Sequence, residues 1–284
     1  MGIKIKTSFL LLFMCLTVDL VYASHPIYFL LTHPRSTGTA FEKMMRTRGD
    51  TEVVHQPFLD PFLLKWLPAN DPYLKSIPPN LTYNDVRNKL FQLAEKNSVF
   101  FKEQGSIVLD YFKTHPDFYQ NPQLRFAFLI RDPAKSIISC YRKMPSIDNT
   151  GIGLIGHKEL WELFNMIQEF TGKPPLVIDS DDLLKNPLPI LNKLGEIWEM
   201  TFIEKDLHWE RGYTDEWLHV DDSWYIEVGN STELGPYRGD IPRQEDGTPE
   251  YAEIKDLQTR KRLQDMYHAQ IDSYQKLLQH AVKP

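Results

Sequence analysis

A short polar turn at residues 33–39, HPRSTGT, follows an apolar run and opens into a helical pattern. At such a strand–turn–helix junction, free backbone N–H groups point at an anion and the helix dipole favours its negative charge. Arg35 adds a cationic donor, and Ser36 and Thr39 add hydroxyl groups. The turn is therefore a candidate phosphate site, although a plain polar turn with a Ser or Thr cap gives the same pattern.

A second candidate for anion binding lies at residues 131–139, RDPAKSIIS. Arg131 ends an apolar run, Pro133 suits the first position of a helix, and Ser139 falls two helical turns later. Arg131 and Ser139 could therefore converge on a second phosphate. Arg-Asp-Pro is also a common strand-to-helix turn, so this segment alone leaves both interpretations open.

Other nucleotide and metal patterns are weaker. The turn at 33–39 is shorter than the Walker A phosphate loop and lacks its lysine, which disfavours an ordinary ATPase or GTPase. Residues 151–156, GIGLIG, have the spacing of a dinucleotide fingerprint, but no strand pattern precedes them. The acids at 179–182 favour a helix cap over a metal site, and the histidines lack metal-ligand spacing. No metal is predicted.

Short apolar runs predict the strands that must position these residues. They are mostly continuous, as in strands covered on both faces, and lie at 27–32, 51–55, 98–102, 124–130 and 176–179. Helical patterns alternate with them or follow them, at 39–48, 83–96, 135–142, 158–171, 189–198 and 256–278. The alternation predicts an α/β fold, with a central parallel sheet and helices on both faces.

Residues 208–250 are rich in Trp, Gly, Pro and acids and show little periodicity. We interpret them as a long ordered loop or lid, so that residues 24–284 form one domain. Several aromatic side chains of the lid could line an apolar ligand pocket, although packing within the loop is the alternative: Trp209, Trp217, Trp224, Tyr225 and Tyr237.

Length and composition exclude several classes of protein. The chain has 284 residues, is 42% hydrophobic and 12% aromatic, and carries a formal net charge of −6. This is enough apolar material for a core, which excludes wholesale disorder, and the acidic balance argues against a nucleic-acid partner. The two cysteines exclude a disulfide-dense scaffold and a four-cysteine zinc site.

Residues 1–23 have the features of a targeting segment. Lys4 and Lys6 form a positive start, and residues 7–16 are almost wholly apolar. Asp19 interrupts the apolar run, which disfavours a membrane-spanning helix of about 20 residues. We expect a cleaved signal peptide, an exported or secretory-pathway protein and no stable membrane span after cleavage. An uncleaved anchor is the alternative.

In their order and spacing, segments 33–39 and 131–139 together resemble the two binding segments of sulfotransferases that use 3′-phosphoadenosine 5′-phosphosulfate (PAPS). In that family a strand-end loop with Lys or Arg, Ser, Gly and Thr holds the 5′-phosphosulfate. A later Arg-x-Pro, with Ser eight residues after the Arg, holds the 3′-phosphate. Residues 177–187, VIDSDDLLKNP, are similar to an acidic segment of many of these enzymes. Landmarks at 53–58 and 207–212 extend the resemblance over most of residues 26–280.

The resemblance implies a sulfotransferase with a P-loop-type fold. It would move a sulfuryl group from PAPS to a hydroxyl or amine of a small-molecule or glycan acceptor. Arg35 and Lys102 are the cations expected near the transferring group. The residues implied in donor binding are Arg35, Ser36, Thr37, Gly38, Thr39, Ala40, Arg131, Ser139 and, from the lid, Arg238.

A general base should deprotonate the acceptor. The related pattern has an acid where this sequence has Gln56, which cannot take a proton. His55 and Glu103 are the two candidate bases, and the sequence does not rank them. Two alternatives to the sulfotransferase interpretation stay open: a nucleotide-binding, kinase-like transferase, and a non-catalytic binding protein with the same fold. The sequence gives no oligomeric state.

Overall fold

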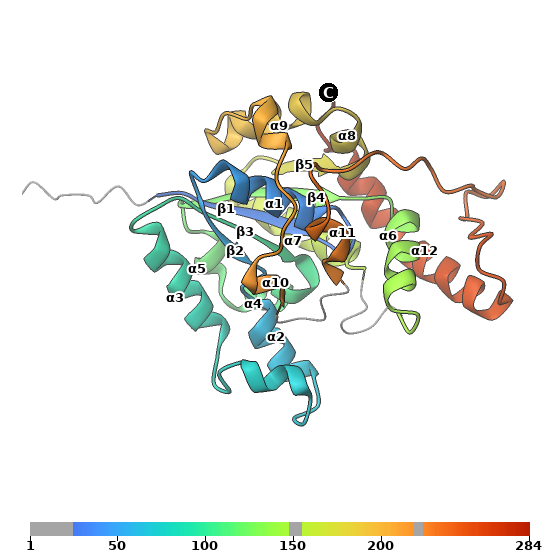
Figure 1. Ribbon diagram of the computed structural model, residues 1–284, viewed down its shortest axis with the longest axis horizontal. Coiled ribbons are helices and arrows are strands. Elements are labelled where there is room, and N and C mark those ends of the chain that lie inside the picture. The colour runs from blue at the N-terminus through green and yellow to red at the C-terminus, as the bar shows by residue number, and fades with distance from the viewer. Residues whose placement is uncertain (1–24, 148–154, 219–223) are drawn as a thin grey trace, which may run out of the picture.

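The computed structural model describes residues 25–147, 155–218 and 224–284. Residues 1–23, with the expected signal peptide, and most of the GIGLIG stretch lie outside the described residues. Five parallel strands form one sheet in the order β2-β3-β1-β4-β5 (Figure 1). They are β1 (Ile27–Thr32), β2 (Glu52–His55), β3 (Val99–Gln104), β4 (Leu124–Ile130) and β5 (Leu176–Asp179).

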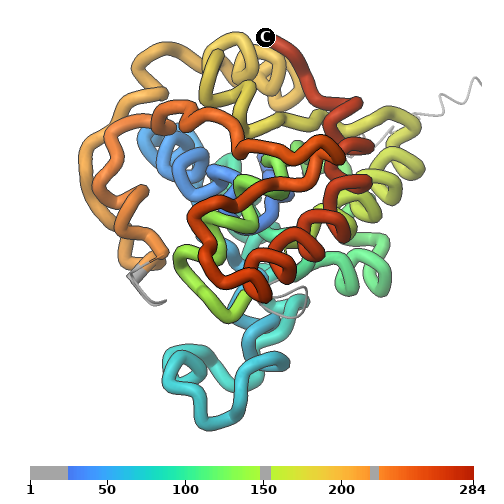
Figure 2. Tube along the Cα trace, turned by 90° about the vertical axis from the view of Figure 1, so that its right-hand side faces the viewer, coloured from blue at the N-terminus to red at the C-terminus, as the bar shows by residue number. Residues whose placement is uncertain are grey.

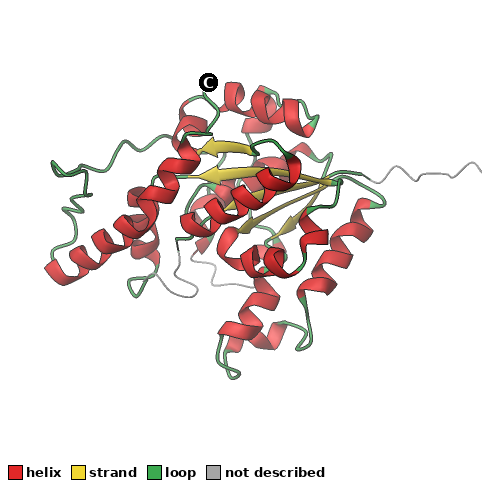
Figure 3. Cartoon of the chain, turned by 180° about the vertical axis from the view of Figure 1, so that it is seen from behind, coloured by secondary structure: helices red, strands yellow, loops and turns green. Residues whose placement is uncertain are grey.

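Helices cover both faces of the sheet (Figure 3). On one face lie α3 (Tyr83–Ala94), α4 (Gly105–Thr114), α5 (Pro116–Tyr119), α7 (His157–Thr171) and the end of α12 (Leu257–Leu278). On the other lie α1 (Gly38–Arg48), α8 (Ser180–Lys185) and α9 (Pro187–Trp198). This arrangement confirms the predicted α/β fold with a parallel sheet between two helical layers.

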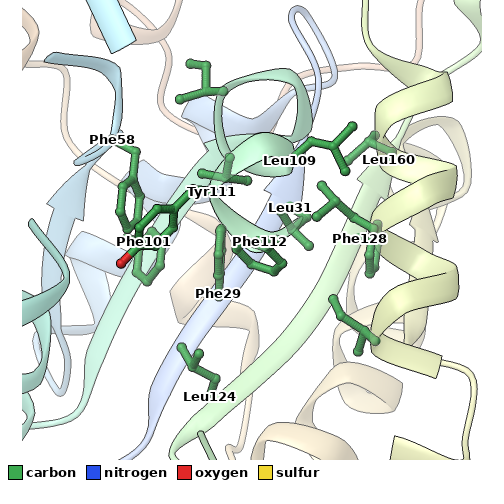
Figure 4. Close-up of a cluster of buried hydrophobic side chains, with 14 of the residues drawn as sticks. Phe29, Leu31, Phe58, Phe101, Leu109, Tyr111, Phe112, Leu124, Phe128 and Leu160 are labelled. Atoms are coloured by element: carbon green, nitrogen blue, oxygen red, sulfur yellow. The ribbon is translucent and has the colours of Figure 1, made fainter. Parts of the chain in front are cut away.

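The side chains of β1 alternate between the two apolar layers, as the period of a strand requires. Phe29 and Leu31 face the layer of α4 and α7, where Phe29 packs edge-on against Phe112 at 6.0 Å between ring centroids (Figure 4). Tyr28 and Leu30 face the layer of α1 and α9. Because both faces are covered, the strand carries no polar face, which explains its continuous apolar run.

Helices α2 (Leu59–Trp66), α6 (Pro133–Lys143) and α11 (Ile226–Gly229) contribute residues to the carboxyl-end side of the sheet, where the strands open into a cavity. Helix α6 follows β4 directly, and α2 with the 3₁₀ turn η1 (Pro72–Ser76) projects from the body (Figure 2). Within residues 208–250 the described part is mostly irregular, with two one-turn helices, α10 (Asp215–Leu218) and α11. The 3₁₀ turn η3 (Glu204–Leu207) leads into this segment.

After β3 the structure differs from the expected elements in two ways: the strand is longer than predicted, and a helix that was not predicted, α4, follows it. Strand β3 runs to Gln104, and α4 begins at the next residue, so no turn residues announce the helix. A Cβ atom on Gly105 would lie 2.8 Å from a side-chain carbon of Leu160, so this close junction depends on glycine.

In the described part of the chain, no helix is both long and apolar enough to cross a membrane.

Candidate functional site

A cavity of about 540 Å³ lies at the carboxyl ends of β1, β3 and β4. This is the edge at which open parallel sheets bind their ligands. Most of the predicted donor-binding residues line it: Arg35, Thr37, Gly38, Thr39, Ala40, Arg131, Ser139 and Arg238. Lys102, the second predicted cation, lines it as well. The side chains of Ser36, His55 and Glu103 are buried and are not part of the lining.

The turn after β1 is bent so that helix α1 starts at the cavity wall. Arg35 and Thr37 have left-handed backbone angles, with φ of 63° and 76°. Ser36 lies inside the turn and donates its hydroxyl hydrogen to the His33 carbonyl at 2.8 Å. A Cβ on Gly38 would lie 3.2 Å from side-chain carbons of Lys102 and β1, so glycine allows α1 to begin this close to the strands. The first N–H groups of α1 have no partner within the helix and can face an anion.

The two candidate anion segments contact each other. Arg35 donates from Nε to the Ser139 hydroxyl at 2.9 Å, and Arg131 donates from Nη1 to the Arg35 carbonyl at 2.9 Å. Burial lowers the pKa of Arg131, and the neighbouring positive charges of Arg35 and Arg238 lower it further, against the opposing effect of nearby Asp181. Three guanidinium groups therefore share one end of the cavity, an arrangement suited to a ligand with several negative charges.

Lys102 and His55 are partners in the register of β2 and β3, and both face Glu42 of α1. Glu42 is fully buried; its Oε2 lies 2.6 Å from His55 Nδ1 and 3.8 Å from Lys102 Nζ. Burial alone would raise the pKa of Glu42, but His55, Lys102 and Arg46 outweigh it and lower the pKa to about 2. The carboxylate is therefore ionised at neutral pH.

His55 is consequently oriented with one nitrogen toward the lid. Since ionised Glu42 can only accept, His55 Nδ1 carries the proton and Nε2 keeps a free lone pair. Burial lowers the pKa of His55, which keeps the ring neutral. Nε2 lies 3.0 Å from the hydroxyl of Tyr225, which donates to it. Tyr225 thus stands between this nitrogen and the cavity that it lines.

Glu103 has a different environment from His55. It is fully buried, and its carboxylate accepts from the N–H groups of Phe58 and Gln104, both at 2.9 Å, and from the Gln56 amide at 3.3 Å. Burial raises the pKa of Glu103 to about 7. Gln56, with φ of 32°, therefore acts as a donor to Glu103, where a second carboxylate would meet repulsion.

Helix α1 also holds the lid. The Lys43 ammonium group is buried and donates to four backbone carbonyls of the lid at 3.0–3.3 Å, those of Gly212, Val228, Gly229 and Ser231. Trp217 donates its indole N–H to Glu42 at 3.1 Å. Glu227 of α11 forms an ion pair with Arg35 at 3.1 Å, so a carboxylate of the lid neutralises the guanidinium group of the turn.

Sequence reasoning did not assign Glu42 and Lys43 their roles. The available signal was the pair of adjacent charges among apolar residues of a helix that lies between the sheet and a long loop. Lys135 was also missed; it is buried and pairs with Asp181 at 2.6 Å and Asp240 at 2.9 Å. Among the described residues, no group of three or more His, Cys, Asp or Glu side chains is arranged to hold a metal ion.

Residues 29–249 match the family model of a sulfotransferase domain. This match covers most of the chain, and the protein therefore belongs to the sulfotransferase domain family, as its motifs predicted.

Comparison with single proteins gives more distant similarities. The chain is 28% identical over 204 residues to the branched-chain-amino-acid aminotransferase-like protein 1 of Arabidopsis thaliana; the aligned part is 70% of this chain and 35% of that protein. The chain thus spans about a third of that relative's length.

Two solved structures have a similar backbone. One is the sulfotransferase domain from the olefin synthase of Synechococcus PCC 7002, with 15% identity, 86% and 95% of the two chains covered and a TM-score of 0.48. The other is a sulfotransferase from Alicyclobacillus acidocaldarius, with 10% identity, 91% and 98% covered and a TM-score of 0.48. The family assignment rests on the sequence match rather than on these structural similarities.

Proposed function

We propose that the protein transfers a sulfuryl group from PAPS to a hydroxyl or amine of a small acceptor. The observation that carries the proposal is the contact between two cationic segments on one cavity. Arg35 with the start of α1 forms one anion subsite, and Arg131 with Ser139 and Arg238 forms the other. A nucleotide with a 5′-phosphosulfate and a 3′-phosphate requires two such subsites.

The residues of the turn would position the donor and stabilise charge. Sulfuryl transfer by in-line attack needs little covalent chemistry from the protein, as in phosphoryl transfer. The acceptor atom forms its bond to sulfur while the bond from sulfur to the bridging oxygen breaks and adenosine 3′,5′-bisphosphate leaves. Arg35 and Lys102 would offset the negative charge that grows on that oxygen.

We assign the general base to His55 rather than Glu103. His55 Nε2 is unprotonated, and its lone pair already accepts from a hydroxyl group, that of Tyr225 at 3.0 Å. An acceptor hydroxyl in place of the Tyr225 hydroxyl would give its proton to Nε2, while Glu42 stabilises the imidazolium that forms. The carboxylate oxygens of Glu103 accept hydrogen bonds from the backbone N–H groups of Phe58 and Gln104, and Gln56 also donates to this carboxylate. Tyr225 must shift before the acceptor can reach His55.

The lining of the cavity supports a small acceptor with an apolar body. Helices α2 and α6, the turn after α6 and the lid contribute apolar side chains to it: Leu59, Leu63, Ile138, Met144, Ile147, Trp224 and Ile241. Such a wall binds a ring or an alkyl chain through burial of apolar surface.

The test combines donor binding with turnover. Adenosine 3′,5′-bisphosphate should raise the melting temperature more than ATP, GTP or NAD at equal concentration. Transfer of label from PAPS to a panel of phenols and alcohols should fall about 100-fold or more in Arg35→Ala. His55→Gln should lose a similar factor but still bind the bisphosphate. Lys89→Ala, at an exposed position of α3, is the control for loss of a cation outside the cavity.

Three results would change the assignment. Stronger stabilisation by ATP than by the bisphosphate would favour a kinase-like transferase. Tight bisphosphate binding without turnover of any acceptor would favour a non-catalytic binding protein. Equal turnover by wild type and Arg35→Ala would refute the proposed transfer chemistry.

A further inference from the structure

Two buried histidines hold the backbone of Arg131 from both sides. His33, in the turn after β1, is 3% exposed, and His157, the first residue of α7, is 0% exposed. The Arg131 N–H donates to His33 Nε2 at 3.0 Å, and His157 Nε2 lies 2.8 Å from the Arg131 carbonyl oxygen. Both polar groups of one residue's backbone are therefore bound by imidazole rings that the proposed mechanism does not use.

These partners require opposite tautomers in the two rings. His33 Nε2 accepts an N–H, so its proton lies on Nδ1, which donates to the Pro34 carbonyl at 3.0 Å. His157 Nε2 faces a carbonyl, so it carries the proton, and its Nδ1 has no partner among the described residues. The ring centroids are 4.1 Å apart, so two positively charged rings would repel each other and the nearby Arg131 guanidinium group.

Both histidines are held neutral by the same cause. Burial lowers the pKa of His33 well below its usual value, and His157 and Arg131 lower it further. Burial also lowers the pKa of His157, to about 4, although its bond to the Arg131 carbonyl and the nearby Asp132 oppose this. A neutral His33 is a condition of the arrangement, because a protonated Nε2 could not accept from Arg131.

The side chain of Arg131 has an unused donor. Its Nη1 donates to the Arg35 carbonyl at 2.9 Å, whereas its Nε is buried and has no partner among the described residues. Buried donors are rarely left unpaired in native proteins, and Arg131 lines the cavity. An anion in the cavity would supply the missing acceptor. The direction of this side chain depends on its backbone, which the two histidines fix.

We propose that His33 and His157 are positioning residues that aim the Arg131 guanidinium group at the 3′-phosphate of the donor. The inference rests on the proposed function, because it takes the 3′-phosphate as the ligand of Arg131. Through the bond from Arg131 to the Arg35 carbonyl, the same pair supports the left-handed turn that begins the other anion subsite.

Calorimetry on the full chain tests the proposal with two probes. Adenosine 3′,5′-bisphosphate has the 3′-phosphate and adenosine 5′-monophosphate lacks it, so the ratio of their affinities measures recognition of that group. His157→Gln keeps an N–H donor near the ε position, and His157→Leu keeps apolar bulk but has no donor. We expect the ratio to fall about tenfold in His157→Leu. In His157→Gln it should stay within about twofold of wild type.

Each outcome has a distinct meaning. An unchanged ratio in folded His157→Leu, or an equal loss in His157→Gln, would overturn the positioning role. A wild-type chain that binds both nucleotides equally would overturn the proposed function, and the inference with it.

A measurement on the wild-type chain needs no variant to fold. Long-range ¹⁵N–¹H spectra of the histidines at pH 7 should show Nδ1–H for His33 and Nε2–H for His157. The reverse pattern, or a charged ring, would refute the proposal.

Discussion

The Glu42→Gln substitution removes one buried charge and keeps the shape of the side chain. Glu42 is 0% exposed, and its carboxylate contacts His55, Arg46, Trp217 and Lys102. Burial opposes ionisation, but His55, Lys102 and Arg46 outweigh it and lower the pKa from 4.5 to about 2. Since His55 is neutral and acts on Glu42 as a hydrogen-bond donor rather than as a positive charge, the ionised carboxylate stabilises the folded chain at neutral pH by about 1–3 kcal/mol, the range of hydrogen bonds to a charged group.

The sign of the pH dependence follows from this lowered pKa. The contribution of Glu42 is complete above the unfolded value of 4.5 and is lost as the pH falls toward the folded value of about 2. The difference in unfolding free energy between wild type and Glu42→Gln should therefore be about 1–3 kcal/mol at pH 7 and smaller at pH 3.5. Urea unfolding followed by circular dichroism at a series of pH values measures this difference.

Glu95→Gln is the matched control, because Glu95 lies exposed at the end of α3. Its unfolding free energy should differ from wild type by less than about 0.5 kcal/mol at every pH. A Glu42→Gln difference that is small at pH 7, or that widens as the pH falls, would refute the reasoning. It would show that the carboxylate is not held ionised by its neighbours, and it would remove the basis for the tautomer of His55.

Three further substitutions test the lid, the turn and the fold. Lys43→Met should release the lid, and the amides of residues 224–231 should exchange hydrogen at least about tenfold faster while those of β4 stay protected; unchanged exchange would contradict the tether. Glu227→Gln should strengthen bisphosphate binding about two- to fivefold in calorimetry, because Arg35 then binds the ligand without first breaking its ion pair with Glu227; weaker binding would argue against this. Gly105→Ala should lower the unfolding free energy by about 1–3 kcal/mol, since its Cβ needs space that α7 occupies; an unchanged urea midpoint would refute it.

The strands could be predicted because their environment leaves a simple pattern. Strand β1 is fully buried over its six residues, and its continuous apolar run follows from cover on both faces. Helix α4 was missed for a different reason. It begins at Gly105, directly after the last residue of β3, so no turn residues separate the helix from the strand.

The two candidate anion segments could be located in the sequence because the residue types that mark them are local, and the structure places both on one cavity. Arg35 and Ser139 belong to turns whose residue types and spacing already favour phosphate. The contacts that decide the state of His55 are different in kind. Glu42 lies thirteen positions away and Tyr225 lies 170 positions away, and no periodicity in a single chain connects them. Likewise, Gln56 departs from the related pattern in sequence, but only the fold shows that it pairs with Glu103.

The four backbone carbonyls that bind Lys43 have a consequence for how the sequence of the lid can vary. All four oxygens that bind its ammonium group are backbone carbonyls, which every amino acid supplies. The contacts of Lys43 therefore do not depend on which side chains the lid carries. Apolar lid residues of the cavity wall, such as Trp224 and Ile241, could be replaced while these four contacts persist. This independence makes the lid a suitable segment for directed evolution, with Lys43 left untouched.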